Sequence, residues 1–255
     1  MPSHIKYVPV GSKIYVFGNH HYMTLSALSI DCRSNTVQHL PSMTTNLIVT
    51  VGEFIDGKIY IIGYCNNEWK KVKMVVFNTE TQIWEPEIIK QDIAIDLTGP
   101  IYGVVIADKM YVRGRDNTFV YEPKGGKWKK HEMLSSKRWE NACVVDGVLY
   151  YYDRVENMLR TYDPKHMCWG VVNGLERFFA ETRDSLWLET VGYGGKLVLF
   201  FHIYLGKIIT NQIWCAEILL ERRQGGDNIW GKPKGCNHVT NGRNFHLRQS
   251  LAVML

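Results

Sequence analysis

The chain has 255 residues, 45% of them hydrophobic, and a formal net charge of +5. This size and composition allow a substantial hydrophobic core. The small excess of positive charge does not form the continuous basic stripe that nucleic-acid binding needs. The longest apolar run, 197–205, is interrupted by His202 and is too short to span a membrane, so we expect neither nucleic acid nor membrane as a partner.

A short motif recurs along the chain, in which a two-residue turn is followed by a strand that reaches a tyrosine. The steps between successive copies are 45, 51, 39 and 48 residues. Turns such as Asp56-Gly57 tolerate the positive φ of a two-residue hairpin, so each copy predicts two short antiparallel strands. The copies reach Tyr15, Tyr60, Tyr111, Tyr150 and, with the tyrosine lost, Val198.

A second regular spacing follows these motifs. In three copies an aromatic residue stands seven positions before a tryptophan. Polar turn residues separate the two members, which predicts a second hairpin and a four-stranded unit of roughly 45 residues. The three pairs are Phe77 and Trp84, Tyr121 and Trp128, and Tyr162 and Trp169. Ile30 and Val37 keep the spacing without aromatics, whereas Leu220 precedes Trp230 by ten residues.

This pattern resembles the kelch repeat, whose unit is one four-stranded blade of a β-propeller. The resemblance implies an all-β, kelch-type β-propeller with about five four-stranded blades and a C-terminal strand of an incomplete or shared closing blade. The Gly-Gly that ends the second kelch strand is degenerate here, as in Gly63-Tyr64. We expect one domain over residues 1–255, with blades at about 4–43, 48–89, 102–130, 141–172 and 191–236 and a closing strand at 249–255.

The expected final strand is similar to the first strand of a further blade, yet no other strands follow it. Either the ring closes on five blades with an added strand, or the chain lacks an amino-terminal portion that would complete the closing blade. We favour the second alternative.

The repeated aromatic residues are expected to pack between blades rather than to contact a ligand. A single blade is apolar on both faces and cannot bury them alone, so large rings fill the space between neighbours. The predicted structural set is Tyr15, Tyr60, Trp84, Tyr111, Trp128, Tyr150, Trp169 and Trp230.

Longer stretches resemble the plant F-box/kelch-repeat proteins, namely 145–153, 161–165, 213–223 and the closing Leu251-Ala252-Val253. In that family an amino-terminal F-box docks on the Skp adaptor of a cullin ubiquitin ligase, and the propeller selects the protein to be ubiquitinated. The resemblance implies a non-enzymatic protein-interaction module that recognises substrates for such a ligase. Met1 is only nine residues before Val10, so we expect no F-box here and no recruitment of Skp or cullin.

Signatures of catalysis and cofactor binding are missing from the sequence. It contains no Gly-x-Ser-x-Gly, His-Glu-x-x-His, P-loop or EF-hand pattern and no Glu-x-x-x-Asp-x-x-x-His iron motif. The run 192–195, Gly-Tyr-Gly-Gly, precedes a strand rather than a helix, which predicts a hairpin turn and not a phosphate site. We predict no catalytic residue, cofactor or metal. Two alternatives stay open, a truncated and poorly functional relic and a small-molecule-modifying kelch enzyme.

The six cysteines are scattered, without a Cys-x-x-Cys pair, and no Asn-x-Ser/Thr sequon occurs. The start of the chain, 1–6, lacks the basic and apolar regions of a secretory signal. These features predict reduced thiols and a cytoplasmic or nuclear location.

Propellers bind partners with the loops at one face, because loops vary freely on a rigid frame. Arginine suits an acidic peptide, since its planar guanidinium pairs with a carboxylate through two hydrogen bonds. We therefore expect a protein partner at the loops that join second to third strands and at the inter-blade loops of the same face. The candidates there are His20, His21, Asn66, Glu68, Arg115, Asp116, Arg138, Arg154, Arg183 and His202.

Overall fold

The structure is a computed structural model that describes residues 5–18, 26–43, 47–65, 68–85, 95, 100–183, 185–205, 208–223, 228–241, 247 and 249–253. The chain divides into two compact units. Unit 1 comprises Met1–Ser135 with Val253–Leu255, and unit 2 comprises Ser136–Ala252.

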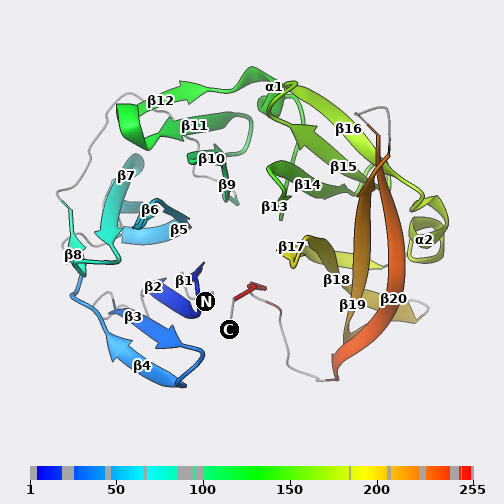
Figure 1. Cartoon of the computed structure of the whole chain (residues 1–255), viewed down its shortest axis with the longest axis horizontal. Coiled ribbons are helices and arrows are strands. Elements are labelled where there is room, and N and C mark those ends of the chain that lie inside the picture. The colour runs from blue at the N-terminus through cyan, green and yellow to red at the C-terminus, as the bar shows by residue number, and fades with distance from the viewer. Residues whose placement is uncertain are drawn as a thin grey trace. The chain divides into compact units, whose positions relative to one another are not determined.

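Four-stranded antiparallel meanders build both units, and within each meander the strands pair in chain order (Figure 1). Blade one contains β1 (Ile5–Val10), β2 (Lys13–Gly18), β3 (Ser26–Asp31) and β4 (Thr36–His39). Blade two contains β5 (Leu47–Ile55), β6 (Lys58–Cys65), β7 (Glu68–Asn78) and β8 (Ile83–Trp84). Blade three contains β9 (Tyr102–Ile106), β10 (Lys109–Arg113), β11 (Thr118–Glu122) and β12 (Lys127–Lys130), with η1 (Pro123–Gly125) before β12 and α1 (Glu132–Ser135) after it.

Unit 2 holds the remaining two blades. Blade four contains β13 (Cys143–Val145), β14 (Val148–Asp153), β15 (Met158–Asp163) and β16 (Cys168–Asn173), and α2 (Glu176–Glu181) follows it. Blade five contains β17 (Leu186–Tyr193), β18 (Lys196–Leu205), β19 (Ile208–Arg222) and β20 (Ile229–Asn241). A short parallel pairing of β16 with β20, at Val172–Ile229 and Asn173–Trp230, joins the two blades into one sheet.

The first hairpins of blades two and five have the predicted kind of turn. Asp56 and Gly57 have φ values of 47° and 74°, and Gly194 and Gly195 have values of 55° and 73°. Both central residues thus lie in the left-handed region, as a type I′ turn requires. The glycine-rich stretch before β18 is therefore a hairpin turn, as its position before a strand predicts.

The seven-residue spacing has a geometric cause in the second hairpin. The two members of each pair lie directly opposite one another in the third and fourth strands. Their ring centroids are 4.9, 4.9 and 5.1 Å apart for Phe77–Trp84, Tyr121–Trp128 and Tyr162–Trp169. Each tryptophan therefore packs on its aromatic partner across the hairpin.

The turn between β7 and β8 shows how the polar residues fix this spacing. Asn78 Oδ1 accepts hydrogen bonds from the backbone N–H groups of Glu80 and Thr81, at 3.0 and 2.9 Å. Gln82 then adopts a φ of 60°, and Met167 adopts 50° at the same offset before Trp169. A side-chain cap followed by one left-handed residue thus returns the chain to the register of the aromatic pair.

Blade five departs from this arrangement and from the expected boundaries. Trp230 lies opposite Glu221 rather than Leu220, and the Arg223 guanidinium carbon lies 3.7 Å from the centroid of its ring. The first strand begins at residue 186 rather than 191, and the fourth strand continues to 241 rather than 236. The register shifts between β19 and β20 lie farther from the turn, at Ile213/Trp214 and Glu217/Ile218, so the pairing next to the turn already sets the position of Trp230.

Inter-blade packing forms the cores of both units. In unit 1 one cluster joins blades one and two around Phe17 and Phe77, and a second joins blades two and three around Ile62 and Met110. In unit 2 a cluster joins blades four and five around Phe201. The repeated tyrosines Tyr15, Tyr60, Tyr111 and Tyr150 are buried, and Trp84, Trp128, Trp169 and Trp230 are half-buried.

The closing strand expected at 249–255 is not formed over 249–253, which have no regular secondary structure. The backbone N–H of Ser250 instead donates to the carboxylate of Glu189 on β17. A side-chain acceptor thus takes the place of a strand ladder at this point. Residues 254 and 255 lie outside the described residues.

Within the described part of the chain, no helix is long and apolar enough to cross a membrane. The same residues contain no group of three or more His, Cys, Asp or Glu side chains placed to hold a metal ion.

We predict that Gly63→Ala destabilises the chain by about 1–3 kcal/mol, because overpacking forces the backbone to move. A Cβ at Gly63 on β6 would lie 2.4 Å from the carbonyl oxygen of Ile48, where β5 has a bulge between Val49 and Val51. Urea unfolding measures the change. Gly125→Ala is the matched control, since a Cβ there meets nothing within 4 Å; equal midpoints for the two variants would contradict the prediction.

Candidate functional site

A pocket of about 340 Å³ lies within unit 2. Three segments line it: the linker that precedes β13, the end of β14 with the following turn, and the start of β17. The lining residues lie at 136–138, 140–141, 152–155 and 187–190. The linker and the turn are an inter-blade loop and a second-to-third-strand loop, the two kinds of loop expected to meet at one face.

The linker is held in place by a buried tryptophan. Trp139 is fully buried, whereas its neighbours Arg138 and Glu140 are exposed and line the pocket. Trp169 Nε1 also donates to Ser136 Oγ at 3.3 Å, which ties the start of the linker to β16. The alternation of buried and exposed residues thus presents Arg138 and Glu140 at the pocket. Lys137 also lines it, with its Nζ 3.8 Å from Glu156 Oε1.

The turn after β14 is organised by Asp153. Its carboxylate accepts hydrogen bonds from the backbone N–H groups of Val155 and Glu156, at 3.0 and 3.2 Å, and from Arg160 Nε at 2.9 Å. Burial alone would raise the pKa of Asp153, but these hydrogen bonds and the Arg160 charge outweigh it and lower the pKa. Asp153 is therefore ionised, and its carboxylate holds the turn through these hydrogen bonds.

Arg154 spans the pocket from this turn to β17. Its Nη2 donates to the carbonyl oxygen of Trp187 at 2.7 Å, although most of the Arg154 side chain is exposed. A guanidinium carries five N–H donors, so this contact fixes its position and leaves donors that face solvent. Arg154 is thus a positioned cation at the pocket.

Aromatic side chains form the apolar part of the pocket. The Trp187 and Tyr152 ring centroids are 4.5 Å apart, and the Tyr152 hydroxyl donates to Asn157 Oδ1 at 2.6 Å. Burial raises the pKa of Tyr152, against the opposing effects of the neighbouring Trp187 indole and the Arg154 charge. Among the described residues, Trp187 Nε1 is buried without a hydrogen-bond partner of normal geometry.

Val155 stands at the rim and is 94% exposed. Glu189, the third carboxylate of the lining beside Glu140 and Asp153, accepts the hydrogen bond from Ser250. The pocket therefore combines two outward-facing arginines with an aromatic wall and an uncovered aliphatic side chain. This arrangement is suited to binding an anion that carries an apolar neighbour.

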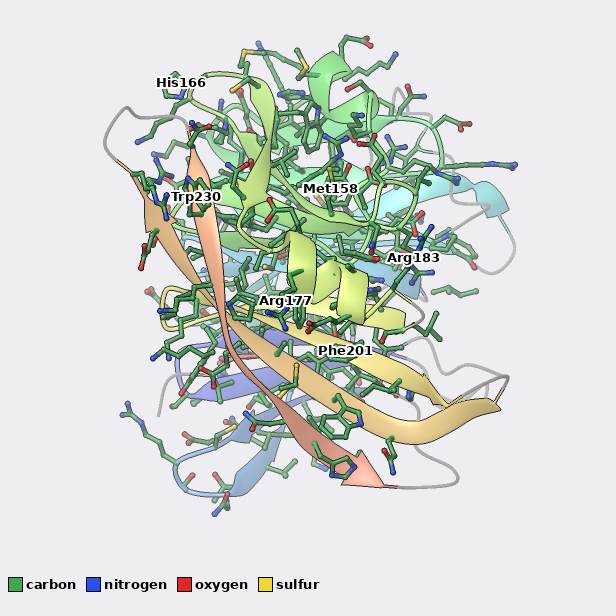
Figure 2. The ribbon with its side chains drawn as sticks, turned by 90° about the vertical axis from the view of Figure 1, so that its right-hand side faces the viewer. Met158, His166, Arg177, Arg183, Phe201 and Trp230 are labelled. Carbon is green, nitrogen blue, oxygen red and sulfur yellow. The ribbon has the colours of Figure 1, made fainter. Side chains whose placement is uncertain are left out.

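Of the predicted partner-binding residues that the structure describes, Arg138 and Arg154 line this pocket. Arg183 is exposed just after α2 and is not one of the lining residues. Figure 2 labels it together with Arg177 of α2. Arg115 and Asp116 are exposed in the β10–β11 loop of unit 1.

The β10–β11 loop is fixed by a residue that sequence reasoning passed over. Arg113 is only 4% exposed, and its guanidinium donates to the carbonyl oxygens of Arg115 and Ser135, at 3.2 and 3.3 Å. The buried arginine thus holds the loop from beneath and leaves the Arg115 side chain in solvent.

Two candidates expected in loops lie in strands. His202 is within β18, opposite Ile213 of β19, and its Nδ1 lies 3.1 Å from the carbonyl oxygen of Gln212. Glu68 is the first residue of β7, and its side chain is outside the described part. Both predictions were wrong because the strands run past the points where the kelch glycines would end them. His20, His21 and Asn66 lie outside the described residues.

Sequence reasoning also missed Trp139, Tyr152, Val155 and Trp187, which shape the pocket. Tyr152 stands where the second kelch strand would end in glycines, whereas the other three residues fall outside the repeated positions. A tryptophan in the otherwise polar stretch 135–140 was the available signal for Trp139, whereas Trp187 lay in a stretch expected to be a loop.

Comparisons with known proteins agree with this architecture. The family model described as FKB95, Kelch-repeats domain, matches residues 1–240. The F-box/kelch-repeat protein At4g38940 of Arabidopsis thaliana is 44% identical over 262 residues, which cover 100% of this chain and 68% of that protein. The F-box/kelch-repeat protein At4g39240 of the same plant is 34% identical over 238 residues, which cover 91% of this chain and 60% of that protein.

Among solved structures, YjhT has a TM-score of 0.56 at 12% sequence identity, with 90% of this chain and 83% of that chain covered. This likeness concerns the fold alone. The family match over residues 1–240 and the two plant relatives, together with meanders that carry the repeated tyrosines and aromatic–tryptophan pairs, show that the chain belongs to the plant F-box/kelch-repeat family, with an FKB95 kelch-repeats domain in a β-propeller fold.

Proposed function

We propose that the chain is a non-enzymatic protein-recognition module, which binds a protein partner through the pocket of unit 2. The single observation that carries this proposal is the meeting of Arg138, Arg154 and exposed Val155 at one pocket on a rigid strand frame. Loop residues on such a frame bind partners without paying the entropy of ordering a flexible segment.

The names of the relatives suggest what kind of protein this chain binds. They are named F-box/kelch-repeat proteins, and the chain spans 68% and 60% of the length of the two compared above. We propose that the bound partner is a protein destined for ubiquitination, and that this chain supplies the substrate-recognition part of the ligase. A cytoplasmic or nuclear location is part of the same proposal, and the five described cysteines are free thiols, consistent with it.

A pull-down from plant extract, followed by mass spectrometry, tests the proposal. The purified chain is the bait, and its thermal melt is recorded first to establish that it folds cooperatively. We expect the same protein to be recovered in independent extracts, and to bind directly when it is purified and titrated in a calorimeter. We expect no Skp adaptor or cullin among the recovered proteins.

Each other outcome argues against one part of the proposal. A cooperatively folded bait that recovers no protein reproducibly contradicts partner recognition. Recovery of Skp and cullin contradicts the expectation that this chain does not recruit the ligase by itself. A bait that does not melt cooperatively favours the poorly functional relic.

A further inference from the structure

We infer that the pocket of unit 2 binds the carboxylate of an aspartate or glutamate in an extended partner segment, next to an apolar partner residue. The inference rests on the proposed function and specifies the chemistry that the partner must present. It follows from the charges and the apolar surfaces that surround the pocket.

Two guanidinium groups supply the attraction for an anion. Among the residues that the structure describes, Arg138 has no ion-pair or hydrogen-bond partner, and it is exposed at the pocket. Arg154 is anchored by its bond to the Trp187 carbonyl oxygen and keeps further donors. A carboxylate that enters the pocket accepts hydrogen bonds from guanidinium donors that otherwise face solvent. An acidic side chain is therefore the complementary group.

The carboxylates of the lining favour a singly charged ligand over a phosphate. Asp153 is engaged by Arg160 and by the turn backbone, and Glu189 by Ser250, so neither neutralises the two arginines. Both still add negative potential, as does exposed Glu140. Three cations, Lys137, Arg138 and Arg154, face these three carboxylates in the lining, so the pocket has no surplus positive charge to offset the larger desolvation cost of a dianionic phosphate. This balance favours the singly charged carboxylate of aspartate or glutamate.

The apolar surfaces indicate what stands beside the acidic residue. Val155 is 94% exposed, and Trp187 and Tyr152, with ring centroids 4.5 Å apart, line the same pocket. A leucine, isoleucine or phenylalanine next to the acid covers the valine and removes this apolar surface from water.

Selection from a library of random seven-residue peptides on the immobilised chain tests this inference. We expect the selected peptides to share Asp or Glu beside an apolar residue. The consensus peptide, labelled with fluorescein, is then titrated by fluorescence anisotropy. Arg138→Glu should weaken binding about tenfold or more, as should Glu→Gln or Asp→Asn in the peptide. Arg183→Glu is the matched control, because it reverses an exposed arginine outside the pocket, and it should leave the affinity unchanged.

A consensus without an acidic residue overturns the inference, as does a library that yields no consensus. Equal losses for Arg138→Glu and Arg183→Glu also overturn it, because they indicate an unspecific effect of charge. Tighter binding of a phosphoserine peptide than of its glutamate counterpart overturns the choice of a carboxylate. A partner from the pull-down that binds Arg138→Glu as well as the unaltered chain leaves the proposed function standing and removes only this inference.

Discussion

Trp187→Ala is expected to lower the stability of unit 2 by about 3–5 kcal/mol, the usual range for deletion of a buried tryptophan. The side chain is only 5% exposed and lies at the centre of an aromatic cluster. Its ring centroid is 4.5 Å from that of Tyr152, 4.9 Å from Phe201 and 5.4 Å from Phe179. Truncation removes these contacts and leaves a cavity between blades four and five.

Hydrogen exchange followed by mass spectrometry places this loss in the molecule. Amide protection should fall in β14 and β18, with a lower midpoint in urea unfolding. Trp187→Phe should cost less, because it keeps a ring and removes a buried N–H that has no partner among the described residues. Val155→Ala, at a 94% exposed position, should change stability by less than about 0.5 kcal/mol. A Trp187→Ala loss as small as that of Val155→Ala would mean that the cluster does not stabilise unit 2.

The blades could be predicted from the sequence because each signal there reports a local geometry. Phe77 and Trp84 are opposite neighbours in one hairpin, so their spacing in sequence fixes their contact. Asp56-Gly57 specifies its own turn through the φ values that these residues tolerate. Such relations need no knowledge of the rest of the chain.

The site could be predicted only in part, because a pocket depends on contacts between distant segments. Arg138 and Arg154 were found from strand order, which places their loops at the same face. Trp187 was missed, because its role arises from packing against rings of β14 and β18 rather than from a repeat position. The position of His202 was misjudged for a related reason, since strand length is decided by pairing with β19 and not by local composition.

The second large effect concerns Glu53 on β5, which has no hydrogen-bond or ion-pair partner among the described residues. Its side chain is largely buried beside Gly103, where a Cβ would lie 2.9 Å from Glu53 Oε1. Burial raises the pKa of Glu53 from 4.5 to about 7, although the Lys6 charge opposes the shift. The folded chain therefore holds this carboxyl in an environment that disfavours its ionised form.

Glu53→Gln is accordingly expected to stabilise the chain at pH 8, by at most about 3 kcal/mol. At that pH the carboxyl is ionised in both folded and unfolded chains, and only the folded chain bears the desolvation cost. As the pH falls from 7 towards 4.5, the folded chain binds a proton before the unfolded chain does, so the unaltered protein gains stability relative to the variant. The advantage of Glu53→Gln should therefore shrink through this window.

Urea unfolding of both proteins at pH 8, 6.5 and 5 measures that difference directly. Glu80→Gln removes an exposed carboxylate from the turn between β7 and β8 and serves as the control. We expect its difference from the unaltered chain to stay nearly constant between pH 8 and 5. If the Glu53→Gln advantage is equally constant, or grows as the pH falls, then Glu53 is solvated in the folded chain and the raised pKa is refuted. If the advantage of Glu53→Gln shrinks as expected, the stability of unit 1 depends on the protonation of one carboxyl on β5, the first strand of blade two.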